Sequence, residues 1–183
     1  DDLTTKFFAN YDESHERPEV QSYDRYYLGP IVLSIKKEGR SIIDGQQRLT
    51  SVTLLLIYLN NLQKDRKDSV SLEHLIFSEA YSVKSFNLQV EDRKECIEAL
   101  YNGQEYDAVG KGESVLNIIE RYRDIQELYP EELRGNALPY FIEWLINNVI
   151  FVEIDTYSDE DAYTIFETMN DRGLNLTSTE MLK

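Results

Sequence analysis

The sequence predicts an α+β fold, and three observations support this. Two strand-like runs rich in β-branched and aromatic residues, 26–35 and 41–44, come early and are joined by a short turn. Residues 91–147 then repeat apolar side chains at helical spacing. A β-type run at 149–154 and a helical pattern at 159–169 follow. We therefore expect a small sheet, a helical insertion, and a last strand and helix that return to the first layer.

In the first part of the chain, two predicted strands are followed by a predicted helix. The first two strands are expected to pair antiparallel because only a short turn joins them, and Pro30 fits the entrance of a strand or an edge. Residues 46–63 are apolar on nearly all sides, which predicts a central helix. Residues 11–25 are polar and charged and predict an exposed loop or a loose helix. Residues 85–90 alternate like a strand.

The helical middle divides into three predicted helices, at 91–101, 113–129 and 138–147. Ser158 is a candidate N-cap for the final helix, and Asn170-Asp171-Arg172-Gly173 is expected to end it at Met169. The expected organisation is a core over residues 1–90, a helical subdomain over 91–147 and a returning strand and helix over 148–183, within a longer protein.

Composition limits the function classes. The 183 residues hold 34 acidic and 19 basic side chains, a formal net charge of −15, so broad binding to a nucleic-acid backbone is disfavoured and any DNA contact is expected to be local or indirect. No apolar run is long enough to cross a membrane. The single cysteine, Cys96, cannot form an internal disulfide and fits a cytoplasmic protein, where we expect it to pack as a small hydrophobe. His15 and His74 have no zinc-ligand spacing around them.

Residues 44–48, Asp-Gly-Gln-Gln-Arg, carry the strongest functional signal. They lie between a predicted strand and a predicted helix, where unpaired N–H groups and the positive end of the helix dipole favour anions. Gly45 lets the backbone approach a ligand or take a positive φ. Arg48 offers a planar fork for phosphate or carboxylate. The motif is therefore a candidate phosphate site.

A structural interpretation of the same residues is simpler. Asp44 is a good helix N-cap, and Gln46, Gln47 and Arg48 would then be solvated residues of the first turn. Spacing alone slightly favours this interpretation. Residues 166–173, taken alone, likewise describe a helix that ends at a glycine.

Three motifs in order nevertheless resemble one large prokaryotic family. Residues 44–50 are similar to its DGQQR signature, and residues 27–33, Tyr-Leu-Gly-Pro-Ile-Val-Leu, are similar to its preceding strand. Its downstream motif is matched by Phe166, Glu167, Asn170, Arg172, Gly173, Leu176, Leu182 and Lys183. This DGQQR family includes the S portion of GmrSD modification-dependent restriction enzymes and related subunits of phage-defence systems.

The resemblance implies a ParB/sulfiredoxin-like fold with a small mixed sheet, and a domain that binds and hydrolyses a nucleoside triphosphate (GTP, CTP or ATP) with magnesium. It implies that Asp44 positions water or the metal ion, that Gln46 and Gln47 orient water or bind phosphate, and that Arg48 neutralises phosphoryl charge. Gly45, Asn170 and Arg172 would complete the nucleotide pocket. The implied partner is a C-terminal nuclease domain or subunit.

The chain also departs from the family pattern. The family's opening Tyr-Gln-Arg-Pro-Tyr-like strand is matched only by Arg17-Pro18, and no His-Asn-His nuclease motif is present, so we expect no DNA cleavage by these residues. Two other functions stay open. One is a non-catalytic module that binds phosphate, DNA or a protein partner through the same turn, and the other is a purely structural helical domain.

Overall fold

The computed structural model describes residues 2–37, 39–80, 83–86 and 91–173. The chain groups into two compact units. The helical unit consists of Asp1–Tyr26 and Arg48–Val149, and the sheet unit of Tyr27–Gln47 and Ile150–Lys183. The predicted domains, 1–90, 91–147 and 148–183, stay a prediction.

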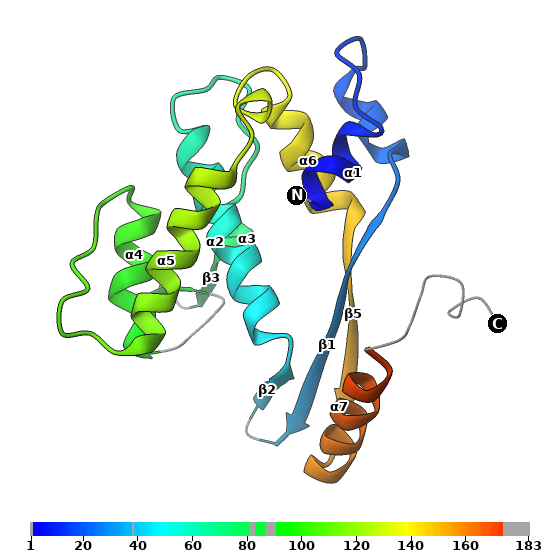
Figure 1. Cartoon of the computed structure of the whole chain (residues 1–183), viewed down its shortest axis with the longest axis vertical. Helices are drawn as coiled ribbons and strands as arrows, with labels where there is room; N and C mark the ends of the chain where they lie inside the picture. Colours follow the sequence, from blue (N-terminus) through cyan, green and yellow to red (C-terminus); the bar gives the residue numbers. More distant parts are fainter. Residues whose placement is uncertain (1, 38, 81–82, 87–90, 174–183) are drawn as a thin grey trace. The chain divides into compact units, whose positions relative to one another are not determined.

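The sheet unit has three strands in the order β2-β1-β5. Strand β1 (Tyr26–Lys36) pairs antiparallel with β2 (Gly39–Asp44), as their short connection predicts. Strands β1 and β5 (Val149–Thr156) run in the same direction, so the sheet is mixed (Figure 1). Helix α7 (Asp159–Gly173) follows β5. The predicted α+β class, with a small mixed sheet and helices, is confirmed.

Strand β1 is central, and side chains of its neighbours meet across it. Its four residues 31–34 are all buried. Thr156 Oγ1 on β5 donates to the Leu33 carbonyl at 2.8 Å. Arg40 Nη2 on β2 lies 2.6 Å from Glu153 Oε1 and 3.2 Å from Asp155 Oδ2, both on β5. The Thr156 bond therefore ties β5 to β1, and the Arg40 ion pairs join the two outer strands, in addition to the backbone ladder.

Helix α7 is capped as expected but ends later than expected. The Asp161 amide donates to Ser158 Oγ at 3.0 Å, so the predicted N-cap is confirmed. The predicted end at Met169 is wrong, because α7 continues to Gly173. Asn, Asp and Arg cost less than 1 kcal/mol each inside a helix, so they do not stop it, whereas the glycine is its last residue.

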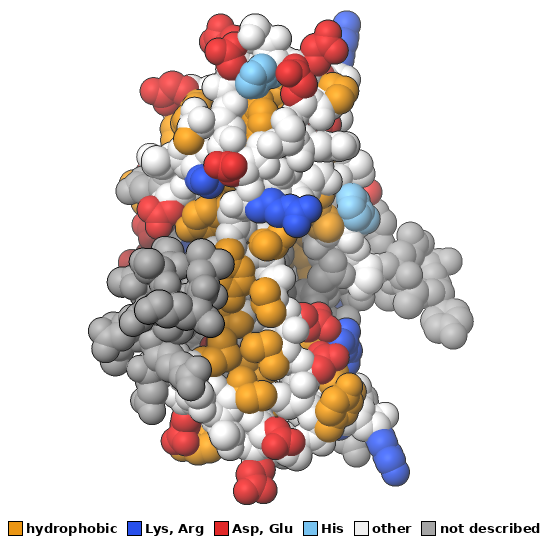
Figure 2. Space-filling view, turned by 90° about the vertical axis from the view of Figure 1, so that its right-hand side faces the viewer, with side chains coloured by type: hydrophobic (Ala, Val, Ile, Leu, Met, Phe, Trp, Pro, Cys, Tyr) orange, Lys and Arg blue, Asp and Glu red, His pale blue; other side chains and the backbone are white. Residues whose placement is uncertain are grey.

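The face on the side of β5 and α7 carries a band of apolar side chains (Figure 2).

The helical unit is built around α2 (Gln46–Leu62). Residues on several sides of this helix are buried, which confirms its predicted central position. Around it lie α1 (Asp2–Phe8), α3 (Glu73–Ile76), α4 (Lys94–Tyr101), α5 (Glu113–Leu128), α6 (Leu138–Asn148) and the hairpin of β3 (Phe77–Ala80) and β4 (Val83–Phe86). Three 3-10 turns, η1 (Arg17–Ser22), η2 (Glu91–Arg93) and η3 (Glu131–Leu133), complete the described part of this unit. Of the strand predicted at 85–90, residues 87–90 lie outside the described residues.

Residues 11–25, predicted as an exposed loop or a loose helix, are mostly exposed and include the 3-10 turn η1. Two of their side chains nevertheless pack into the core, since Val20 and Tyr23 are only 1% and 5% exposed. Arg17, at the start of η1, forms a two-pronged ion pair with Glu143 of α6, with Nε 2.8 Å from Oε2. Two isolated apolar residues have no periodicity, so a pattern search does not detect that they pack into a core. None of the described helices is long and apolar enough to cross a membrane.

Candidate functional site

The Asp-Gly-Gln-Gln-Arg motif occupies the junction between a strand and a helix, as predicted. Strand β2 ends at Asp44, Gly45 follows, and α2 begins at Gln46. On β2, Ile42 pairs with Leu33 while Asp44 pairs with Val32, so Ile43 is an extra residue in the ladder. This is a β-bulge, a device that re-aims side chains at the end of a strand. It places Asp44, rather than Ile43, opposite Val32.

Gly45 is required by the turn itself. Its φ is +96°, a backbone conformation that favours glycine. A Cβ at this position would lie 3.2 Å from Ile31 Cγ1 and 3.3 Å from both Ile31 Cα and the Pro30 oxygen. The sequence left open a positive φ or a close approach to a ligand. The structure shows the positive φ, together with a close approach to β1.

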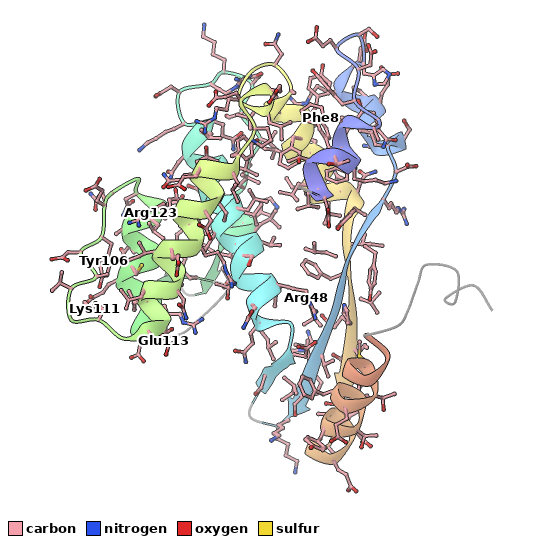
Figure 3. The ribbon with its side chains drawn as sticks, viewed as in Figure 1. Phe8, Arg48, Tyr106, Lys111, Glu113 and Arg123 are labelled. Carbon is pink, nitrogen blue, oxygen red and sulfur yellow. The ribbon has the colours of Figure 1, made fainter. Side chains whose placement is uncertain are left out.

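The four polar side chains of the motif differ in their surroundings. Gln46 Nε2 donates to the Ile42 carbonyl at 2.9 Å, a bond that ties the first helical residue back across the bulge. Gln46 and Gln47 are exposed, whereas Asp44 and Arg48 are half-buried. Arg48 extends from the first turn of α2 (Figure 3). Gly45 lies between Asp44, the last residue of β2, and Gln46, the first residue of α2.

The downstream motif lies mostly outside what the structure describes. The backbone of Asn170 and Arg172 lies in the last turn of α7, but their side chains are not among the described ones. Leu176, Leu182 and Lys183 fall outside the described residues altogether. That Asn170 and Arg172 share a pocket with residues 44–48 therefore stays a prediction.

The helical unit adds a residue that the sequence analysis missed. Arg121 Nη1 of α5 donates to Ser51 Oγ of α2 at 3.0 Å, and Ser51 follows Arg48 by three residues. A signal for it exists in the sequence: Arg121 lies three residues after Ile118 and four before Ile125, on the apolar side of its helix. A charged residue on that side is unusual and needs a polar partner.

A hollow elsewhere in the helical unit is not the predicted site. It has a volume of about 320 Å³ and is lined by the end of α2, residues 69–73 and Tyr101-Asn102. At 1.5 Å per residue, the fifteen or so residues between Gln46 and Asn60 place it roughly 20 Å along α2 from the motif. Gln63, in its lining, is already bonded to the Val70 backbone through both amide atoms, at 2.6 and 2.8 Å. Gln63 therefore holds residue 70 against the end of α2.

The comparison with protein families agrees with the motifs. Residues 1–183 match the family described as GmrSD restriction endonuclease, N-terminal domain. A comparison with curated proteins found no match. The family match covers the strand–bulge–helix junction and the downstream motif together. The chain therefore belongs to the family of N-terminal domains of GmrSD restriction endonucleases.

Proposed function

We propose that this domain binds and hydrolyses a nucleoside triphosphate at residues 44–48 and thereby regulates the nuclease part of a modification-dependent restriction enzyme. The supporting observation is the bulged junction, where Ile43 and Gly45 place four polar side chains at the start of a buried helix. Such junctions present backbone N–H groups to anions. Membership in a restriction-endonuclease family supplies the context of defence against foreign DNA.

Each motif residue has a proposed role. Arg48 binds the phosphates and offsets charge that develops on the transferred phosphoryl group. Gln46 and Gln47 orient a water molecule or donate hydrogen bonds to phosphate oxygens. Asp44 positions the attacking water or a metal ion. Asn170 and Arg172 contact the same nucleotide from α7.

Asp44 can hold a magnesium ion only together with the phosphates of a bound nucleotide. Within the described ranges, no group of three or more His, Cys, Asp or Glu side chains is arranged to hold a metal ion. Magnesium, however, is commonly bound by one or two carboxylates together with substrate phosphates and water. Asp44 supplies one such carboxylate, and the ion would neutralise phosphate charge when bound with the nucleotide.

Calorimetric titration of the full-length protein with GTP, CTP and ATP tests the binding step. We expect one of these nucleotides to bind, and Arg48→Ala to weaken that binding at least tenfold, which corresponds to about 1.4 kcal/mol. Arg123→Ala is the control, because Arg123 is an exposed arginine elsewhere on α5 (Figure 3). Equal binding by wild type and Arg48→Ala, or no binding by either, overturns the proposal.

Phosphate release tests the hydrolytic step separately. Asp44→Asn keeps the size of the side chain but removes its charge, so we expect it to retain nucleotide binding and to lose most of the turnover. A wild-type rate no higher than that of Asp44→Asn, with binding intact, favours the non-catalytic alternative.

The non-catalytic alternative has one observation in its favour. Gly45 and Gln46 both have local structural roles in the junction, so their presence does not by itself require catalysis. In this alternative the turn holds a phosphate or a partner without turnover, and the net charge of −15 favours a protein partner over DNA.

A further inference from the structure

We propose that the outer edge of β5 pairs antiparallel with the same edge of a second copy of this chain, so that the two sheets join into one. The proposal goes beyond the proposed function and does not rest on it, because β5 contains none of residues 44–48. The residues that carry it, 150–155, all belong to the sheet unit.

Strand β5 is an edge strand of the described sheet. In the order β2-β1-β5 it has β1 on one side, and no described strand lies on its other side (Figure 1). Neighbouring residues of a strand point to opposite faces, yet Val152 and Glu153 are both exposed. The described residues therefore cover neither face of β5 at this point, and a second strand can reach the edge.

The β5 edge also lacks the features with which edge strands usually avoid pairing. Its sequence, Val-Ile-Phe-Val-Glu-Ile-Asp-Thr, has no lysine and no proline. Ile150 and Val152 are 37% and 46% exposed, and Figure 2 shows apolar side chains gathered on this side of the protein. An exposed, apolar edge of this kind is a template for pairing with another strand.

Antiparallel pairing about Val152 makes the edge self-complementary. With a twofold axis at this residue, each Val152 lies opposite its own copy. The flanking residues then pair between the copies, Ile150 with Ile154 and Phe151 with Glu153. One face of the joined sheet gains a row of apolar pairs, and no carboxylate lies opposite another carboxylate. This pattern favours a second copy as the partner.

Other registers of the same pairing are less favourable. A centre at Glu153 would place this carboxylate opposite its own copy, and a centre at Ile154 would place it opposite Asp155. A centre at Phe151 avoids both contacts but pairs fewer residues, because Phe151 lies only two residues from the start of β5. The register centred on Val152 therefore combines a long overlap with the absence of like-charge pairs.

Sedimentation velocity of the full-length protein over a concentration series tests the association. We expect wild type to have the mass of two chains and to dissociate on dilution. Val152→Lys places two ammonium groups side by side at the twofold axis, so we expect it to raise the dimer dissociation constant roughly tenfold or more. Val109→Lys is the matched control, because Val109 is 88% exposed and lies outside the sheet unit. It is expected to associate like wild type.

Cysteine variants of the full-length protein test the register. Residues that lie opposite each other in an antiparallel pair have Cα atoms about 4.5–5.5 Å apart, which a disulfide can bridge. We therefore expect Val152→Cys to form an intermolecular disulfide on mild oxidation, seen as a doubled mass on a non-reducing gel. In Ile150→Cys the two thiols are offset by four residues, about 13 Å along the strands, and we expect no disulfide. Cys96 is 0% exposed, and wild type gives the background from any other cysteine.

The contrary outcomes are distinct. A wild-type protein that stays monomeric overturns the proposal, and so does a dimer that Val152→Lys leaves unchanged. Equal disulfide formation by Val152→Cys and Ile150→Cys indicates random collision and also overturns it. If wild type is monomeric and the thiol of Val152→Cys resists a reagent, another part of the same chain covers the edge instead. Should Val152→Lys not fold, the two cysteine variants decide.

Nucleotide titration of Val152→Lys separates this proposal from the proposed function. We expect the variant to bind nucleotide like wild type, because Val152 lies outside residues 44–48. Failure of the dimer therefore leaves the nucleotide site standing, and failure of nucleotide binding leaves the dimer standing.

Discussion

At the scale of single residues, Gly45 determines whether the strand–helix junction can form. Replacement by Ala forces a side chain into a positive φ and places its Cβ 3.2 Å from Ile31 Cγ1. We expect Gly45→Ala to lower the free energy of unfolding by about 1–3 kcal/mol. Urea unfolding followed by circular dichroism measures this. Gly135→Ala is the matched control, because nothing lies within 4 Å of its added Cβ.

The two variants differ in their expected effect on the free energy of unfolding: Gly45→Ala should lower it, and Gly135→Ala should leave it almost unchanged. Gly135→Ala is expected to stay within about 0.5 kcal/mol of wild type, as is usual for open surface positions. A Gly45→Ala protein as stable as Gly135→Ala contradicts the close approach of the turn to β1.

Cys96 is a buried thiol, as predicted from the sequence. Its side chain is 0% exposed, and burial raises the pKa of the thiol. Little thiolate therefore exists at pH 8, and we expect no reaction with a thiol reagent until the protein unfolds. Because folding raises the pKa of the Cys96 thiol, the contribution of this group to the free energy of unfolding is fully present below the ordinary thiol pKa. It declines as the pH rises above that value. Fast labelling of the folded protein, measured by absorbance, would contradict this.

At the scale of elements, the pairing of α6 with residues 15–24 holds the N-terminal segment in the helical unit. Asn148 Nδ2 donates to the Tyr23 carbonyl at 2.6 Å, and Trp144 Nε1 donates to the Asp24 carbonyl at 2.9 Å. Tyr140 Oη donates to the His15 carbonyl at 2.9 Å. These side chains lie on one face of α6 and satisfy the backbone of a segment that lacks a regular ladder of its own.

Two adjacent asparagines of α6 test this pairing. Asn148 is 2% exposed, whereas Asn147 is exposed and bonds only within its own helix, to the Glu143 carbonyl at 2.9 Å. We expect Asn148→Ala to destabilise the protein by about 1–2 kcal/mol, because the Tyr23 carbonyl loses its donor. The loss is moderated because Asn148 Oδ1 is buried without a partner. Asn147→Ala is expected to change stability by less than about 0.5 kcal/mol, and equal unfolding midpoints would refute the assignment.

Elements with a strong pattern were predictable, and contacts between elements were not. The two strands and long helix around residues 44–48 follow from alternation, a turn and a continuous apolar run, which are all local signals. Val20 and Tyr23 were missed because single apolar residues show no period. The bulge at Ile43 depends on how β2 pairs with β1, and Arg121 acquires its neighbour only when α5 packs on α2. The motif could therefore be located, but not its full set of neighbours.

At the scale of the whole molecule, the negative net charge disfavours DNA binding but is compatible with binding a small anion at one site. The chain carries 34 acidic and 19 basic residues, and several of the basic ones are already paired, including Arg17, Arg40 and Arg66. A small polyphosphate needs only two or three well-placed cations. A duplex needs a broad basic surface, because its binding depends on neutralising many phosphates at once.

We therefore expect this domain alone not to bind unmodified duplex DNA, even though we propose that it binds a nucleotide. Fluorescence anisotropy with a labelled duplex should show a dissociation constant weaker than about 10⁻⁴ M at about 0.15 M salt, the weak end of non-specific binding. Lowering the salt should change this little, since few counterions are released by a chain of net charge −15. The full-length protein is the comparison, because any DNA binding that it shows and this domain lacks comes from the rest of the protein. A steep rise in affinity of this domain at low salt would reveal a basic groove and contradict the expectation.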